Sequence, residues 1–291
     1  MKGKFSEYHP SVILIYFVVV ISFSMFVLHP VFLGISLISS ITYSIMLNSK
    51  NALKFNIIYM LPTMIIAVII NALTNRMGTT IIVWQISLEA ILFGIAAAIM
   101  IACVLSWFSC YNKIMTSDKF IYIFGKTIPS LSLVISMIFR FVPRFKAQFK
   151  KTVNAQKCIG NDITEGTLTI RIKKLLKIIS IMTSWALENS IETADSMKNR
   201  GYGLKGRSTF NDYKFKKNDL IVLIYTLLTA VYIIISISTD VIYYTYYPVA
   251  YFNNTSFKSL ITYAIYTVLC CIPIIIDTKE DIKWKYFQSK I

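Results

Sequence analysis

The sequence predicts an all-α integral membrane protein with about six transmembrane helices plus cytoplasmic amphipathic helices. Hydrophobic residues fill 56% of the 291 positions and charged residues only 15%, which is too apolar for a soluble chain of this size. The apolar residues gather in six long runs. The basic residues, which give a net charge of +16, gather mostly in one stretch between the fourth run and the fifth. These observations define the fold class and divide the chain into three regions.

The N-terminal region, residues 1–111, contains four apolar runs at about 11–28, 31–47, 55–73 and 81–111. Each is near the roughly 20 residues that cross the hydrocarbon core of a bilayer, although the first two are short. Ser87 is typical of a helix N-cap, so we expect the fourth helix to begin near residue 88. Glu89 then serves either the helix end or a buried functional site. His29-Pro30 and the stretch from Asn71 to Gly78 are expected to be tight outer turns.

The middle region, residues 112–217, holds 20 of the 30 Lys and Arg residues but only seven of the 14 acids. Strong basic charge is compatible with nucleic-acid binding. Here, however, the charge is bracketed by apolar runs, which favours contact with anionic lipid headgroups and argues against a nucleic-acid partner.

The C-terminal region, residues 218–291, has two apolar runs at about 219–238 and 257–276, followed by a basic tail. With six crossings, one side of the membrane receives the middle region and most of the other lysines: Lys2, Lys4, Lys50, Lys54, Lys279, Lys283, Lys285 and Lys290. The opposite side receives Arg76, Lys258 and a loop at 240–256 without Lys or Arg. The positive-inside rule therefore predicts that the middle region and both termini are cytoplasmic. The first run lacks an obvious small-residue cleavage site, so we interpret it as a span.

The middle region is expected to contain two long helices. Residues 118–160 form a mostly apolar stretch interrupted by Pro129 and Pro143, which we expect to lie along the membrane surface. A seventh crossing there would place the basic residues that follow on the outside. A turn-like linker at 159–166 leads to a second helix at about 170–200. Apolar residues recur along this helix at i, i+3 and i+4 and predict a buried stripe: Leu175, Ile178, Ile179, Met182 and Ala186.

The second helix ends in the segment Ala194-Asp195-Ser196-Met197-Lys198-Asn199-Arg200-Gly201-Tyr202-Gly203. An arginine in the last turn, followed by glycine, puts a planar fork of hydrogen-bond donors at an exposed helix end. In a protein that is otherwise so apolar, such an end indicates a docking surface. Arg200 and Gly201 are its central residues.

The chain resembles the transmembrane T proteins of energy-coupling factor (ECF) transporters, a family that includes the CbiQ-type subunits. Four segments carry the resemblance: Arg140-Phe141-Val142-Pro143, Ala155-Gln156-Lys157-Cys158-Ile159-Gly160, Ala186-Leu187-Glu188-Asn189, and Ala194 to Gly203. The resemblance implies a subunit of the bacterial plasma membrane that joins two cytoplasmic ABC ATPases to a substrate-binding S component for vitamin or metal-ion uptake. It also implies that ATP is bound by the partner subunits, so that this chain itself carries no cofactor and catalyses no reaction.

Each of the two coupling helices in this family ends in a short Ala-Arg-Gly-like motif that docks on one ATPase. The second motif corresponds to Asn199-Arg200-Gly201, which keeps the arginine and the glycine. The first corresponds to Cys158-Ile159-Gly160, where Ile159 stands in place of the expected arginine. Either Lys157 substitutes for that arginine, or the contact there is mainly apolar. The other family-like positions are expected to support these helices: Arg140, Pro143, Ala155, Gln156, Glu188, Ala194 and Asp195.

Two other classes of protein fit the sequence less well. An integral-membrane enzyme would need convergent carboxylates, histidines or a nucleophile pair, and the chain has no HExxH or paired-Asp motif. Its five cysteines form no CxxC pair and only two histidines exist, so we expect no metal site. A self-sufficient permease is expected to have charged or polar residues along a pathway within its spans, often with internal repeats; here the spans are nearly free of charge and no repeat is visible.

Overall fold

The computed structural model describes residues 3–48, 56–75, 80–83, 86–127, 129–204, 213–242, 244–248, 251–252 and 256–288. The chain divides into two compact units. The first comprises Met1–Phe120 and Tyr213–Ile291, and we call it the membrane unit. The second comprises Ile121–Asp212, and we call it the helix-pair unit.

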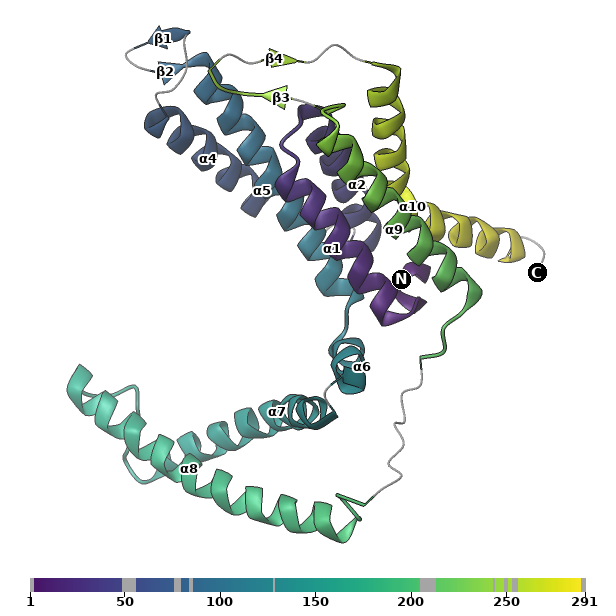
Figure 1. Cartoon of the computed structure of the whole chain (residues 1–291). Helices are drawn as coiled ribbons and strands as arrows, with labels where there is room; N and C mark the ends of the chain where they lie inside the picture. Colours follow the sequence, from purple (N-terminus) through teal and green to yellow (C-terminus); the bar gives the residue numbers. More distant parts are fainter. Residues whose placement is uncertain are drawn as a thin grey trace. The chain divides into compact units, whose positions relative to one another are not determined.

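Within its described residues, the membrane unit contains six apolar helices, shown in Figure 1: α1 (Pro10–Phe26), α2 (Pro30–Asn48), α4 (Leu61–Thr74), α5 (Leu88–Ile114), α9 (Lys217–Ser238) and α10 (Phe257–Gln288). A 3-10 turn at Lys4–Glu7 precedes α1, and a π-helical turn at Asn56–Met60 precedes α4. In the described residues, α2, α5, α9 and α10 are long and apolar enough to cross a membrane, whereas α1 and α4 are shorter apolar helices. The six helices match the six apolar runs, which confirms the all-α, membrane-type fold.

The start of α5 agrees with the sequence. Ser87 caps the helix, because its Oγ accepts a hydrogen bond from the backbone N–H of Ala90 at 3.3 Å. Glu89 is buried and accepts from both the hydroxyl of Thr80, at 2.7 Å, and its backbone N–H. Glu89 therefore fixes the segment that enters the helix. Two short strands, β1 (Ile81–Val83) and β2 (Ile86–Ser87), pair antiparallel just before it.

The predicted outer turns are correct in one case and partly wrong in the other. His29 and Pro30 connect α1 to α2, as expected. The turn expected from Asn71 to Gly78 is wrong at its start, because α4 continues to Thr74. The side-chain amide of Asn71 donates to the carbonyl of Ala67 at 3.1 Å and so satisfies itself within the helix. Residues 76–79 lie outside the described part of the chain.

The core of the membrane unit lies where α5 packs against α1 and α2. Fully buried aromatic side chains gather there, among them Tyr16, Phe17, Tyr43 and Trp107. The indole N–H of Trp107 donates to the hydroxyl of Ser36 at 3.0 Å, so its one polar group is paired. These contacts join helices that are far apart in the sequence.

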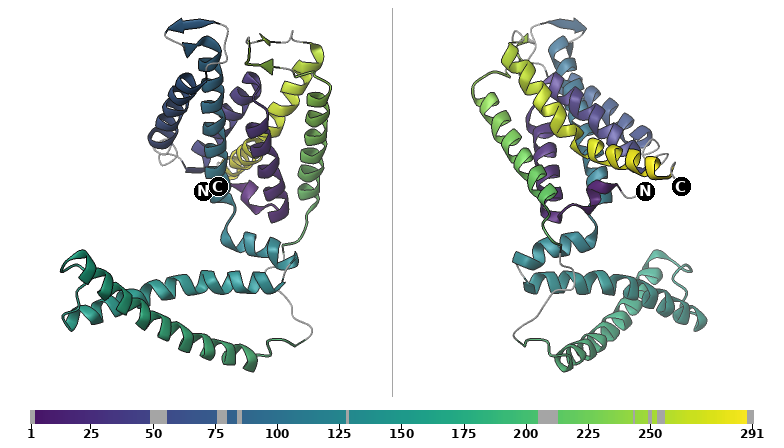
Figure 2. Two further views of the ribbon diagram at one scale, coloured as in Figure 1. Left: turned by 60° about the vertical axis from the view of Figure 1, so that its left-hand side comes forward. Right: turned by 90° about the vertical axis from the view of Figure 1, so that its right-hand side faces the viewer.

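A hydrogen bond between helices accommodates the proline inside α10. Pro273 has no N–H, so the carbonyl of Leu269, four residues earlier, loses its usual partner in the helix. The hydroxyl of Tyr16, which is fully buried in α1, donates to that carbonyl at 3.1 Å. α1 thereby satisfies a backbone group that α10 leaves open. α10 bends along its length in both views of Figure 2.

Two buried carboxylates fix the segment before α1. Asp277 of α10 accepts from the backbone N–H of Phe5 at 2.8 Å. Asp219, in the first turn of α9, accepts from the N–H of His9 at 3.0 Å and from the N–H of Lys216 at 2.7 Å. In the loop at 240–256, which follows α9, the strands β3 (Tyr244–Thr245) and β4 (Tyr251–Phe252) pair antiparallel.

The helix-pair unit is built from two long helices that cross each other: α7 (Pro129–Cys158) and α8 (Leu168–Asn199) (Figures 1 and 2). The shorter helix α6 (Ser117–Thr127) leads into α7. The predicted linker between the two long helices is confirmed, and α8 begins and ends within two residues of the expected range. The interruption expected at Pro143 is wrong, since α7 continues through it. One missing hydrogen bond does not end a helix whose flanking turns hold.

Candidate docking site on the helix pair

The contact between α7 and α8 is made by aromatic and small polar side chains. Phe145 of α7 meets Trp185 of α8 edge to face, with ring centroids 5.1 Å apart. The hydroxyl of Thr152 lies 3.7 Å from the sulfur of Met182, and Thr152 is itself buried. From the predicted apolar stripe, Ile178 is almost fully buried. Ile178 therefore packs α8 on α7, whereas Leu175 and Ile179 of the same stripe are exposed.

An apolar groove of about 550 Å³ runs beside this contact, lined by Phe145, Lys146, Phe149, Ile179, Met182, Thr183, Ala186, Leu187 and Ser190. Three residues of the predicted stripe, Ile179, Met182 and Ala186, form part of its wall. Ile179 is half exposed and Leu187 is 63% exposed. The stripe thus has two uses, because one part is buried in the helix crossing and another part faces an open surface.

The ends of α7 and α8 have the same backbone structure. At the first end, Gly160 N–H donates to the carbonyl of Lys157 at 3.1 Å, and Asn161 N–H donates to the carbonyl of Gln156 at 2.9 Å. This pair of bonds is a Schellman motif. Gly160 has φ +79°, a left-handed conformation that glycine adopts without strain.

The second end repeats this pattern. Gly201 N–H donates to the carbonyl of Lys198, and Tyr202 N–H donates to the carbonyl of Met197, both at 3.0 Å. Gly201 has φ +77°. Ile159 and Arg200 therefore occupy equivalent C-cap positions. Each side chain is exposed, and so are the neighbouring residues Cys158 and Asn199.

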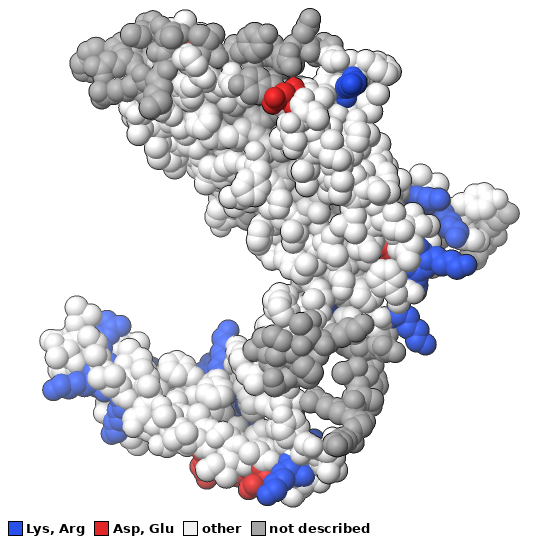
Figure 3. All heavy atoms as spheres, in the orientation of Figure 1, with Lys and Arg blue, Asp and Glu red and all other residues white. Residues whose placement is uncertain are grey.

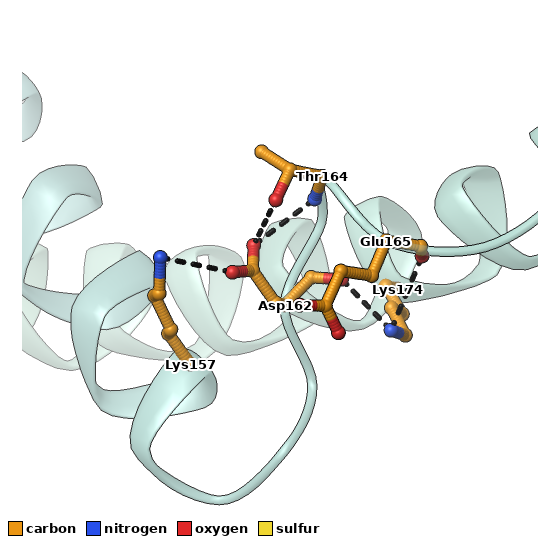
Figure 4. Close-up of polar contacts among 5 residues, drawn as sticks. All are labelled: Lys157, Asp162, Thr164, Glu165 and Lys174. Carbon is orange, nitrogen blue, oxygen red and sulfur yellow. Dashed lines mark hydrogen bonds and ion pairs between the residues drawn. The ribbon is translucent and has the colours of Figure 1, made fainter.

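The charged residues near Ile159 are bonded to groups of the linker between α7 and α8 (Figure 4). Lys157 Nζ lies 3.0 Å from Asp162 Oδ2, and the N–H and hydroxyl of Thr164 donate to Asp162 Oδ1. These bonds to the ionised carboxylate lower the pKa of Asp162 to about 2, and the same pair raises the pKa of Lys157. Lys174 donates to the carbonyls of Asp162 and Glu165. The end of α7 consequently presents the apolar side chain of Ile159 beside a cation that already has a partner.

The charges of the other end are arranged differently. Arg200 lies at a polar pocket of about 220 Å³ between α7 and the last turns of α8, together with Arg140, Phe141, Arg144, Asn189, Glu192, Thr193, Ser196 and Met197. The ion pairs in the described part of the chain join Lys4 to Glu280 and Lys157 to Asp162, so none involves these arginines. On the face shown in Figure 3, Lys and Arg lie along α7 and α8 and near the C-terminal end of α10, whereas most of the surface of the apolar helices is white.

The residues that were expected to support the two helix ends lie in different environments. Gln156 supports the first end directly, because its side chain accepts from the side-chain amide of Asn161 at 3.2 Å. Pro143 lies in the middle of α7. Four others are exposed on the helices and line neither pocket: Ala155, Glu188, Ala194 and Asp195.

Arg144 and Trp185 are close in space, although neither belongs to a motif of the sequence. The guanidinium carbon of Arg144 lies 5.9 Å from the centroid of the Trp185 ring. The two residues are 41 positions apart, so spacing within one helix gives no sign of their contact. In the described residues, no group of three or more His, Cys, Asp and Glu side chains is placed to hold a metal ion.

The fold and the site together define a class: a multi-pass, all-α membrane protein that carries a separate pair of crossed amphipathic helices with matched, exposed ends. No family model matches the chain. Comparison with curated proteins finds 36% identity over 107 residues to the energy-coupling factor transporter transmembrane protein EcfT of Lactobacillus helveticus, covering 36% of this chain and 39% of that protein.

EcfT of Bacillus selenitireducens is 32% identical over 101 residues, which cover 34% of this chain and 38% of that protein. An uncharacterised protein of Mycoplasma genitalium, MG181, is 31% identical over 93 residues, which cover 32% of this chain and 22% of that protein. The chain thus matches about two fifths of the length of the EcfT proteins. Over these segments of about 100 residues the chain is similar to transmembrane proteins of ECF transporters, the T proteins, in agreement with the resemblance seen in the sequence.

Proposed function

We propose that this protein is the coupling subunit of an ECF-type transporter. In this proposal the ends of α7 and α8 dock on two cytoplasmic ABC ATPase subunits. ATP-driven movement of those subunits shifts the two helices. The helices, which are rigid, pass the movement to a membrane-embedded S component that binds the substrate, a vitamin or a metal ion.

The observation that carries the proposal is the repeated helix end. Two C-caps of the same geometry, at Ile159 and Arg200, lie at the ends of two helices that cross. A single exposed helix end is common, but a matched pair on one small unit suits a partner that also comes as a pair. Arg200 offers a guanidinium group that has no ion pair among the described residues, and such a group forms bidentate bonds with a carboxylate.

The proposal places the protein in the bacterial plasma membrane, with the helix-pair unit and both termini in the cytoplasm. The distribution of Lys and Arg supports this orientation. The chain would bind no ATP and catalyse no reaction itself. In support, the buried carboxylates Glu89, Asp219 and Asp277 each accept hydrogen bonds from backbone N–H groups, a structural use of an acid.

Co-purification from native membranes tests the proposal. The tagged protein should recover two ABC-type ATPases and at least one small membrane protein, and uptake by reconstituted vesicles should require added ATP. Uptake by vesicles that contain this chain alone would support the permease alternative. Conversion of lipids by the purified chain would support the enzyme alternative. Either result would contradict a coupling role.

A further inference from the structure

The polar pocket at the end of α8 is lined by three arginines, Arg140, Arg144 and Arg200, but by one acid only, Glu192. In the described part of the chain, no carboxylate lies within ion-pair distance of any of the three guanidinium groups. The pocket therefore has an excess of positive charge that the protein itself does not neutralise. An anionic group from outside would supply what is missing.

Two of the three arginines come from one face of α7. Arg140 and Arg144 are four residues apart, so their side chains leave the helix in nearly the same direction. The guanidinium of Arg144 lies over the ring of Trp185, which is held in turn by Phe145. Trp185 thus restrains Arg144, and a restrained guanidinium loses less conformational freedom when it binds a ligand.

The surface around this pocket is apolar. Phe139 and Val142, beside the arginines on α7, are 49% and 58% exposed. Ile191, next to Glu192 on α8, is 64% exposed. A ligand that suits the whole surface has an anionic group for the arginines and hydrocarbon for the residues around them.

We propose that this pocket, through Arg140 and Arg144, binds the phosphate of an anionic membrane phospholipid. Arginine pairs bidentately with phosphate oxygens, and basic pockets of membrane proteins bind lipid headgroups. The chain joins this unit to apolar helices at both of its ends, so the protein that carries the pocket is itself in contact with lipid. The proposal goes beyond the coupling function, because it concerns the lipid environment and not the ATPases.

The full-length protein in nanodiscs tests the proposal. The wild type and its variants are placed in nanodiscs that contain both phosphatidylcholine and phosphatidylglycerol. Native mass spectrometry then counts how many molecules of each lipid every protein retains. We expect the wild type to retain phosphatidylglycerol preferentially. The double variant Arg140→Ala/Arg144→Ala should lose that preference, by roughly tenfold for each charged bond removed. Arg140→Lys/Arg144→Lys should lose part of it, because lysine keeps the charge but not the fork.

The matched control is Lys173→Ala/Lys177→Ala. These lysines are also four residues apart and exposed on α8, and they line neither pocket. The control removes the same charge and should keep the preference. Equal loss in both double variants would show a general charge effect and would overturn the proposal.

Two further measurements distinguish the lipid from two other anionic ligands, free phosphate and a protein carboxylate. Arginine-dependent stabilisation by inorganic phosphate, in phosphatidylcholine alone and without preference for phosphatidylglycerol, would show a free-phosphate site and overturn the proposal. Loss of ATPase binding by the arginine double variant in phosphatidylcholine alone, with lipid retention unchanged, would show that the pocket takes a protein carboxylate. Since Arg200 is intact in every variant, the lipid proposal can fail while the coupling role stands.

Discussion

Ile159 and Arg200 hold the same position in two copies of one local structure, although their side chains differ in chemistry. Each is the C-cap of a long helix, and each is followed by a glycine in the left-handed conformation, with φ +79° after Ile159 and +77° after Arg200. The backbone therefore presents the two side chains in the same way. Any difference in what the two ends bind must come from the side chains and their neighbours.

Reversing the charge of Arg200 should weaken ATPase binding. Arg200→Glu should leave the protein in the membrane but lower its affinity for an ATPase by roughly a hundredfold or more, because a carboxylate would then face the partner's acid. Binding is measured by pull-down of each ATPase from nanodisc samples. Lys198→Glu, an exposed neighbour in the same turn, is the matched control and should bind almost normally. Equal recovery with Arg200→Glu and wild type would contradict the assignment.

The two ends should differ in their response to salt. The contact at Arg200 is charged and should weaken as ionic strength rises, whereas an apolar contact at Ile159 should persist. We expect Arg200→Ala to reduce ATPase binding and substrate uptake more than Ile159→Ala does. Ile159→Arg should be tolerated, because the backbone there is that of the Arg200 end. If Ile159→Arg abolished assembly while Arg200→Ala had no effect, the two ends would be wrongly assigned.

The ion pair beside Ile159 should lower the chemical reactivity of Lys157. The pair with Asp162 raises the pKa of Lys157, so less of the amine is uncharged and able to react. Asp162→Asn should therefore increase acylation of Lys157, measured by mass spectrometry against Lys173 as internal reference. The pKa of Asp162 is lowered to about 2 from 3.8, so the pair stabilises the linker above that ordinary value and is lost as pH falls towards 2. Unchanged acylation of Lys157 in Asp162→Asn would show that the pair does not form in solution.

The hydrogen bond from Tyr16 to the carbonyl of Leu269 should give a measurable coupling energy between Tyr16 and Pro273. Tyr16→Phe should destabilise the protein by about 1–2 kcal/mol, because it leaves the carbonyl of Leu269 without a partner in the core. Pro273→Ala supplies an N–H to that carbonyl, so in its presence Tyr16→Phe should cost much less. The free energies of unfolding of the wild type, Tyr16→Phe, Pro273→Ala and the double variant, measured by SDS titration, form a double-mutant cycle. Additive effects would mean that the two residues act independently.

Cysteine labelling tests the orientation. In a background without the native cysteines, Ser256→Cys should react with an impermeant reagent added from outside the cell, and Glu165→Cys should react only after the membrane is opened. Both side chains are exposed, so burial does not hide either probe. We expect this pattern because the excess of Lys and Arg in the middle region places that region on the cytoplasmic side. The opposite labelling pattern would reverse the orientation.

Local features of the fold could be predicted from the sequence because they depend on neighbours in the chain. The six apolar runs, the cap at Ser87 and the linker after Cys158 follow from hydropathy, capping and turn chemistry, although α10 continues 12 residues beyond the end of its predicted run, to Gln288. The helix end at Arg200 belongs to this group, since an arginine followed by glycine is a local signal.

Features that depend on packing between distant segments could not be predicted in this way. Tyr16 meets Leu269 across 253 positions, and nothing near either residue indicates the other. Two local features were also missed. The interruption expected at Pro143 is absent, because the turns on both sides keep α7 continuous. The ion pair of Lys157 with Asp162, five residues further on, depends on the Schellman turn that brings the carboxylate back towards the helix.

Asp219 joins the starts of two helices that are far apart in the sequence. The chain returns from the helix-pair unit at Tyr213, and α9 begins four residues later. Asp219 ties that beginning to its own N-cap and to His9, the residue before α1. One carboxylate thus fastens the beginnings of α1 and α9 to each other, so a displacement of either helix start would strain the hydrogen bonds of both.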